Sequence, residues 1–241
     1  MRLILPILLL LAACGGAPAP DEVATVAAPQ PVVQPIFPVP DRAVAQISTG
    51  SWSDEDSRDD TGESERVFAL LGIRPGLTVA DIGAGSGYYT VRLSPALGSS
   101  GKLIANDIIP DYVTRLKARV AGLGFTNVEF LLGDPGNANL PANSTDIALM
   151  VHMYHEIGEP YAFLWRLRPA LREGGQVIVV DGDRPIAQHG TPFRLLVCEF
   201  EAVGYKLVSY NDKAHAGGYL ARFVPEGERP APDAITVCKN P

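Results

Sequence analysis

The chain has 241 residues, 46% of them hydrophobic, and a formal net charge of −7 at pH 7. A chain this acidic lacks the basic balance of a non-specific nucleic-acid binder, so we expect no nucleic-acid partner. The stretch from about residue 46 to the end has the length of one folded domain.

The first residues are typical of an export signal. Arg2 precedes an apolar run over residues 3–11 that is too short to span a bilayer. Residues 11–14, Leu-Ala-Ala-Cys, resemble a bacterial lipobox, which implies cleavage before Cys14 and lipidation of its thiol. We therefore expect residues 1–13 to be a signal peptide and the mature protein to be a lipoprotein of the bacterial cell envelope, on the periplasmic face if there are two membranes. The alternative is an ordinary cleaved signal with an incidental cysteine.

Residues 14–45 are rich in Ala and Pro and have too little apolar bulk to form a core, so we expect a flexible tether. Residues 46–241 then form the folded domain, which contains two cysteines, Cys198 and Cys238. An oxidising compartment would allow them to pair, but two distant cysteines do not make a disulfide framework. Because Cys198 lies among apolar residues, we expect it to act as a small buried hydrophobe.

Short apolar runs alternate with helical patterns, which predicts βαβ units and a parallel sheet. We interpret the acidic run at residues 54–56 as a solvated face and the helical pattern around 65–71 as a cover over a ligand site. A helix is expected over residues 110–123, and Pro95 should kink or end an earlier helix. The fifth strand is expected to follow a break at Gly174-Gly175. The expected parallel strands are residues 78–82, 102–107, 128–132, 147–151 and 176–181.

The alternation of strand and helix patterns ends after the fifth strand. Residues 193–200 mark a helix that stops at Gly204, and residues 205–210 and 219–224 follow as strands with no helical pattern between them. Two such strands are most naturally an antiparallel pair at the sheet edge. The sequence therefore predicts an α/β fold with a doubly wound, seven-stranded, mostly parallel sheet of Rossmann-like type and an antiparallel last strand.

A glycine-rich turn, Asp-Ile-Gly-Ala-Gly-Ser-Gly at residues 81–87, follows the first strand. Glycines at alternate positions let the backbone bend tightly and approach a ligand closely. A nicotinamide dinucleotide loop reads G-x-G-x-x-G, but here the third glycine comes one residue early and Tyr88 occupies the place that pattern needs. Asp81 would repel a pyrophosphate but suits an ammonium group. The loop therefore favours a ligand with a cationic amino-acid moiety over a dinucleotide.

Two further acids follow the next strands. At Asp107 a carboxylate can accept hydrogen bonds from both hydroxyls of a ribose, and the alternative is a carboxylate that serves the N-terminus of the following helix. The spacing of loop and acid suits one βαβ unit, so we favour ribose. Asp134 is placed to accept a hydrogen bond from an adenine amino group, or is a plain turn aspartate before proline.

These motifs, together with Arg-Glu-Gly-Gly at residues 172–175, resemble those of class I S-adenosylmethionine-dependent methyltransferases over about residues 61–223. The resemblance implies the methyltransferase fold, S-adenosyl-L-methionine as methyl donor and a small-molecule or otherwise unknown acceptor. Residues 75–90 and 154–156 are similar to a subset of such proteins predicted to be exported. By the resemblance, the residues that would hold the cofactor are Asp81, Gly83, Ala84, Gly85, Gly87, Asp107, Ile108, Asp134 and Pro135.

Residues 152–156, His-Met-Tyr-His-Glu, follow the fourth strand, where the strand order of a doubly wound sheet reverses and the ligand crevice opens. We favour His155 as the base for the acceptor, because imidazole titrates near neutrality, with Glu156 orienting it or binding a cationic substrate. The alternative is that both only brace the next helix. Residues 181–184 and His189 are expected to line an acceptor pocket or to form a solvated loop.

The sequence does not favour a metal site. His152, His155, Glu156 and His189 are suitable ligand types, but their string matches neither H-E-x-x-H nor H-x-x-E-H, so we expect no metal. Export raises a second functional alternative, since S-adenosylmethionine is made in the cytoplasm. In that alternative a non-catalytic envelope lipoprotein keeps the fold to bind a ligand or a partner. The intact glycine loop and Asp107 favour the enzyme.

Overall fold

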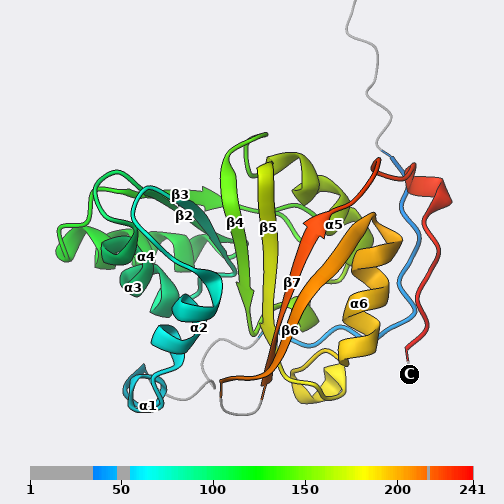
Figure 1. The fold of residues 1–241 in the computed structure, drawn as a ribbon, viewed down its shortest axis with the longest axis horizontal. Helices are drawn as coiled ribbons and strands as arrows, with labels where there is room; N and C mark the ends of the chain where they lie inside the picture. The colour runs from blue at the N-terminus through cyan, green and yellow to red at the C-terminus, as the bar shows by residue number, and fades with distance from the viewer. Residues whose placement is uncertain (1–34, 48–54, 216–217, 241) are drawn as a thin grey trace, which may run out of the picture. The chain divides into compact units, whose positions relative to one another are not determined.

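A computed structural model describes residues 35–47, 55–215 and 218–240, and its compact folded unit begins at Pro35 (Figure 1). The predicted signal peptide, the lipidated Cys14 and most of the predicted tether lie outside these ranges. Among the described helices, none combines the length and the apolar character that a membrane crossing requires.

One seven-stranded sheet forms the centre of the folded unit, in the order β3-β2-β1-β4-β5-β7-β6 (Figure 1). β1 to β5 are parallel, and β7 runs antiparallel to both of its neighbours, which confirms the predicted fold class. The strands are β1 Thr78–Ile82, β2 Lys102–Asp107, β3 Val128–Leu132, β4 Thr145–Val151, β5 Leu171–Asp181, β6 Tyr205–His215 and β7 Gly218–Pro225. Because β1 lies between β2 and β4, the strand order reverses there, and a ligand crevice is expected at the carboxyl ends of these strands.

The sequence only partly predicted how one strand continues past a glycine pair and where one helix ends after a proline. β5 begins at Leu171 and runs through the expected break, because the pairing with β4 shifts register there and Gly174 takes a φ of 73°. The expected break is therefore an irregularity within one strand. α3 (Tyr88–Leu97) keeps Pro95 in its last turn and ends two residues later, in agreement with the expected early end.

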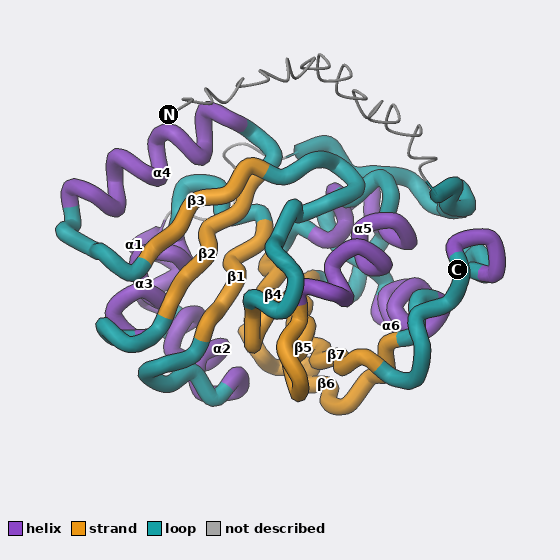
Figure 2. Tube along the Cα trace, turned by 90° about the horizontal axis from the view of Figure 1, so that it is seen from above, coloured by secondary structure: helices purple, strands orange, loops and turns teal. Residues whose placement is uncertain are grey.

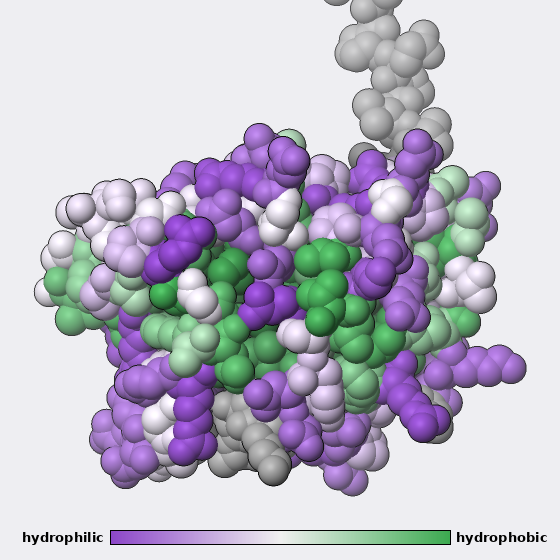
Figure 3. Space-filling model, viewed as in Figure 1, coloured by the Kyte–Doolittle hydropathy of each residue, from purple (hydrophilic) through white to green (hydrophobic). Residues whose placement is uncertain are grey.

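Helices cover both faces of the sheet (Figure 2). The others are α1 Glu55–Asp60, α2 Glu63–Leu71, α4 Pro110–Gly122, α5 Pro160–Leu167 and α6 Phe193–Ala202, with 3-10 turns η1 Tyr154–Glu156, η2 Arg168–Ala170, η3 Ile186–Gln188 and η4 Pro232–Ala234. Val79 and Leu103 pack with α2 and α3, whereas Ala80 and Ile104 pack with α5 and α6. The central strands β1, β2 and β4 are therefore buried on both faces, whereas no residue of the edge strand β3 is buried. Between α2 and α6, hydrophobic side chains gather on the surface seen in Figure 3.

The segment before the sheet belongs to the folded unit, so the expected boundary between residues 45 and 46 lies too late. Nε of Arg42 lies 2.9 Å from Oε1 of Glu199 on α6, and both side chains are buried. Phe37 packs edge-on against Trp165, with ring centroids 5.4 Å apart. Composition pointed to a tether because the segment has little apolar bulk, but a buried ion pair holds it in place. Removing either partner would leave an uncompensated buried charge.

Cys198 on α6 and Cys238 near the C-terminus form a disulfide, with their Cα atoms 5.9 Å apart. The expectation of a buried hydrophobic Cys198 is wrong, since that residue is exposed and only Cys238 is buried. Helix geometry explains the error. Leu196 and Phe200 are four residues apart and share the buried face, whereas a residue midway between them points away from that face.

Candidate functional site

A cavity of about 390 Å³ opens at the carboxyl ends of β1, β2 and β4, and its volume lies within the range of small-molecule sites. The predicted cofactor-binding residues that line it are Asp81, Gly83, Ala84, Gly85, Asp107, Ile108, Asp134 and Pro135. They come from the carboxyl ends of β1 and β2 and from the loops after β1, β2 and β3. The parallel strands thus bring residues that are far apart in the chain to one place.

Gly87 is the predicted cofactor residue that does not line the cavity. It takes a φ of 93° before α3, and a Cβ there would lie 2.1 Å from Cδ1 of Leu116 on α4. Only glycine fits this backbone and this contact, so Gly87 serves the packing of the loop against α4. Gly83 lines the cavity with a φ of 71°, and a Cβ there would lie 2.9 Å from Cγ of Met153. Glycine at this position lets the loop after β4 approach the loop after β1.

The carboxylate of Asp107 connects two loops. Its Oδ2 accepts a hydrogen bond from the backbone N–H of Gly85 at 2.9 Å, and its Oδ1 accepts one from the N–H of Ile109 at 2.9 Å. Ile109 is the residue before the first turn of α4. The carboxylate therefore does serve the start of that helix, yet it also lines the cavity. A carboxylate has about four lone-pair sites, so two remain for the hydroxyls of a ligand.

Asp81 lies beneath the glycine turn and is only 3% exposed. Burial raises the pKa of its carboxyl to about 6, and the nearby charge of Asp107 adds to the rise, while a hydrogen bond from Oγ1 of Thr90 at 2.6 Å opposes it. Ionising this group inside the protein is costly because few charges compensate it. A cationic ligand group next to Asp81 would supply that compensation.

Helix α1 contributes two cavity residues that the sequence analysis missed. Glu55 and Arg58 both line the cavity, whereas the lining includes no residue of α2, the helix predicted to be the cover. The interpretation of residues 54–56 as a solvated face is wrong for Glu55, which pairs with Nη1 of Arg119 at 2.6 Å. The guanidinium of Arg58 lies over the ring of Tyr88, 3.6 Å from its centroid. These partners are distant in the sequence, so no local pattern could have revealed them.

The two predicted catalytic residues both belong to η1 but differ in their relation to the cavity. Glu156 lines the cavity, and His155 does not. His155 is fully buried, with Nδ1 at 3.0 and 3.1 Å from the two carboxylate oxygens of Asp181. Asp181 also accepts a hydrogen bond from Oγ1 of Thr191 at 2.7 Å. The carboxylate of Asp181 at the end of β5 therefore orients the imidazole.

Comparison with known protein families matches residues 73–211, more than half of the chain, to the family described as a methyltransferase domain. The chain is 31% identical over 114 residues to protein-L-isoaspartate O-methyltransferase of Methanococcus maripaludis, covering 44% of this chain and 54% of that protein. It is 26% identical over 121 residues to demethylmenaquinone methyltransferase of Staphylococcus aureus, covering 50% of this chain and 49% of that protein. The chain thus spans about half the length of these two relatives.

Solved structures give the same result. A SAM-dependent methyltransferase from Aquifex aeolicus superposes with a TM-score of 0.64 at 25% identity, covering 69% of this chain and 92% of that one. The likeness shows that the chain has the Rossmann-like methyltransferase fold.

The raised pKa of Asp81 predicts a pH-dependent cost to stability. Its folded pKa of about 6 lies above the ordinary 3.8, so the contribution to stability is complete at low pH and is lost as the pH rises through about 6. Asp81→Asn removes this titration, so the ligand-free variant should be more stable than the wild type at pH 7 by up to about 3 kcal/mol. Urea unfolding of both proteins at pH 4 and pH 7 measures the difference. A difference that does not grow with pH would contradict the assignment.

Proposed function

Because the chain belongs to the methyltransferase-domain family, we propose that it transfers a methyl group from S-adenosylmethionine to an acceptor. Class I methyltransferases use S-adenosylmethionine as methyl donor. One observation carries the proposal: Asp81 and Asp107, from adjacent strands, line a single cavity beside the glycine turn. An acid that can bind a cation, next to an acid that can bind a ribose, matches the methionine amino group and the ribose of S-adenosylmethionine.

The lining residues fit this donor part by part. We assign the amino group to the side of Asp81, the ribose hydroxyls to Asp107, and the adenine to the pocket between Ile108 and Asp134. When bound, the sulfonium supplies an electrophilic methyl group. The protein contributes a fixed position for it and a cavity whose walls exclude water.

We place the acceptor at the end of the cavity formed by the loop after β4. His152, Met153 and Glu156 line this end, and the carboxylate of Glu156 is positioned to bind a polar group of the acceptor. We assign His155 a positioning role in place of the predicted base, because its Nδ1 is held by Asp181 and its ring lies outside the lining. By this assignment it keeps η1, and with it Glu156, in place.

We also propose that the protein is exported and anchored through lipidated Cys14 on the face of the bacterial envelope. The basis is the order of charge, apolar run and cysteine at residues 2–14. The disulfide between Cys198 and Cys238 supports export, since disulfides persist in oxidising compartments. Export also favours a second candidate function, because the methyl donor is made in the cytoplasm. In this candidate the protein is a non-catalytic module that binds a nucleoside-like ligand or an envelope partner. Cofactor binding without turnover on a broad acceptor panel would favour that candidate.

Binding of the demethylated donor tests the cofactor assignment. Isothermal titration of the purified protein with S-adenosylhomocysteine should give one site, and Asp107→Ala should weaken binding at least about tenfold, because two hydrogen bonds to a charged group are lost. Asp111→Ala is the matched control, since this exposed carboxylate lies in the first turn of α4. It should bind like the wild type. Absence of binding by the wild type, or equal losses in the two variants, would reject the assignment.

The anchor makes a separate prediction. After expression in a bacterial host fed an alkyne fatty acid, the wild type should carry the label and sediment with membranes, whereas Cys14→Ser should lose the label. Cys198→Ser should keep it, because that cysteine is not part of the lipobox. A wild type without label would show that Cys14 is not lipidated.

A further inference from the structure

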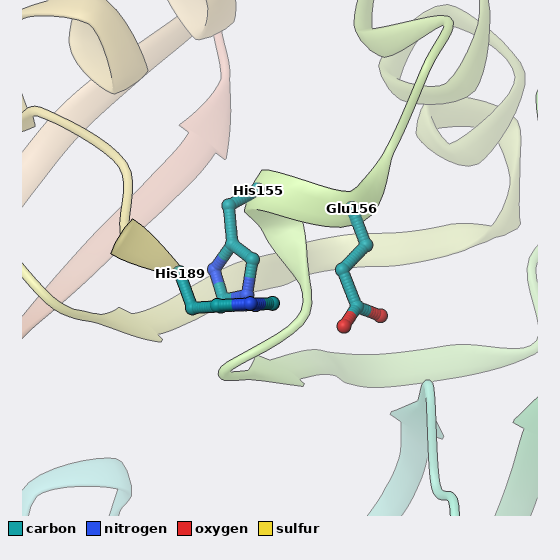
Figure 4. A group of neighbouring side chains, drawn as sticks. All are labelled: His155, Glu156 and His189. Carbon is teal, nitrogen blue, oxygen red and sulfur yellow. The ribbon is translucent and has the colours of Figure 1, made fainter. Parts of the chain in front are cut away.

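Three side chains with metal-binding atoms meet beside the cavity. His155 and Glu156 come from η1, and His189 comes from the loop after β5 (Figure 4). One ligand atom from each lies within 4.8 Å of the other two, and the rings of the two histidines face each other edge to face with centroids 5.6 Å apart. We propose that these three residues bind a divalent first-row transition metal ion, with Zn²⁺ as the type case.

The donor set indicates the class of metal. Two imidazoles and one carboxylate are ligands for Zn²⁺ or Fe²⁺, whereas Mg²⁺ and Ca²⁺ take oxygen ligands. Atoms bound to one such ion at about 2.1 Å lie roughly 3 to 4 Å from one another. The observed spacing needs a shift of about 1 Å at most, within reach of the partly exposed side chains of Glu156 and His189. Three protein ligands leave one position for water or a substrate atom.

The surroundings of His155 are those of a metal ligand. Metal-binding histidines usually have their second ring nitrogen held by a carboxylate, which fixes the tautomer and the ring plane. Here Asp181 contacts Nδ1 with both oxygens, so Nε2 is the nitrogen assigned to the ion. Asp181 is itself held by the hydroxyl of Thr191 and by the N–H of Gly182 at 2.8 Å. A cation on the far side of the imidazole would also compensate this fully buried carboxylate.

Hydrogen bonds within the loop after β5 hold His189 opposite His155. The carbonyl oxygen of Gly182 accepts hydrogen bonds from the N–H groups of Arg184 and Thr191, both at 2.9 Å. The guanidinium of Arg184 donates to the carbonyl oxygen of His189 at 2.9 Å. These contacts support a left-handed φ of 55° at His189, a backbone state that few non-glycine residues adopt.

The imidazole of His189 also has an unsatisfied atom. Its Nδ1 is buried and has no hydrogen-bond partner among the residues that the structure describes. A buried polar atom in this state destabilises the folded protein. Coordination of an ion through this nitrogen would remove that cost.

The position of the site links it to the cavity. Glu156 lines the cavity and belongs to the group of three, so a bound ion would lie at the end where we place the acceptor. An ion at this point lowers the pKa of a bound water or hydroxyl group. Metal binding itself does not depend on methyl transfer and can be measured without the donor.

Zinc binding tests the inference on full-length protein purified without a histidine tag and stripped with a chelator. Titration calorimetry should show one Zn²⁺ per chain and no comparable site for Mg²⁺. Co²⁺ should give the absorption of a low-coordinate site with nitrogen ligands. His189→Asn should weaken Zn²⁺ binding at least tenfold, and asparagine suits the position because it tolerates a left-handed backbone.

The matched control is His152→Asn, since His152 also has a left-handed φ, of 54°, and lies near the group without belonging to it. It should bind Zn²⁺ like the wild type. Glu156→Gln, a partly exposed position where folding is not at risk, should also lose affinity. No Zn²⁺ binding by the wild type, full binding by both His189→Asn and Glu156→Gln, or equal losses in His152→Asn and His189→Asn would overturn the inference. If the wild type binds Zn²⁺ but not S-adenosylhomocysteine, the metal site stands and the proposed function fails.

Discussion

The hydrogen bonds that Asp107 accepts from Gly85 and Ile109 hold the candidate site together. They join the turn after β1 to the start of α4, and so fix the glycine bend against the neighbouring strand end. Without them, two backbone N–H groups in a partly enclosed place would lose their partners. One carboxylate therefore shapes the cavity and also lines it, so its structural role cannot be separated from the ligand-binding role that we propose for it.

This arrangement makes ionisation of the Asp81 carboxyl unfavourable. Asp81 and Asp107 line the same cavity, and Asp81 is almost completely buried. In the ligand-free protein its ionisation is disfavoured by burial first and by the charge of Asp107 second. An ionised carboxylate at this buried position makes the ligand-free protein less stable, and a cationic ligand group beside it would offset that cost. Perturbed acids of this kind are concentrated at functional sites.

The sequence predicted features that arise from local patterns. β1 was predicted at its observed bounds because a short, mostly apolar run directly precedes the glycine-rich turn. The spacing of the glycine turn and Asp107 within one βαβ unit predicted that they lie together, and both line the cavity. Pairings between distant segments were missed: Asp181 with His155, Glu55 with Arg119, and Arg42 with Glu199. Each depends on how the segments pack, and no short motif encodes it.

A crystal structure of the protein with S-adenosylhomocysteine would test most directly whether Asp81 and Asp107 form the binding site for the methyl donor. The ribose hydroxyls should lie within hydrogen-bond distance of the Asp107 carboxylate, and the amino group should face Asp81. A nucleoside bound elsewhere, or one whose amino end points away from Asp81, would show that these two acids do not form a donor site.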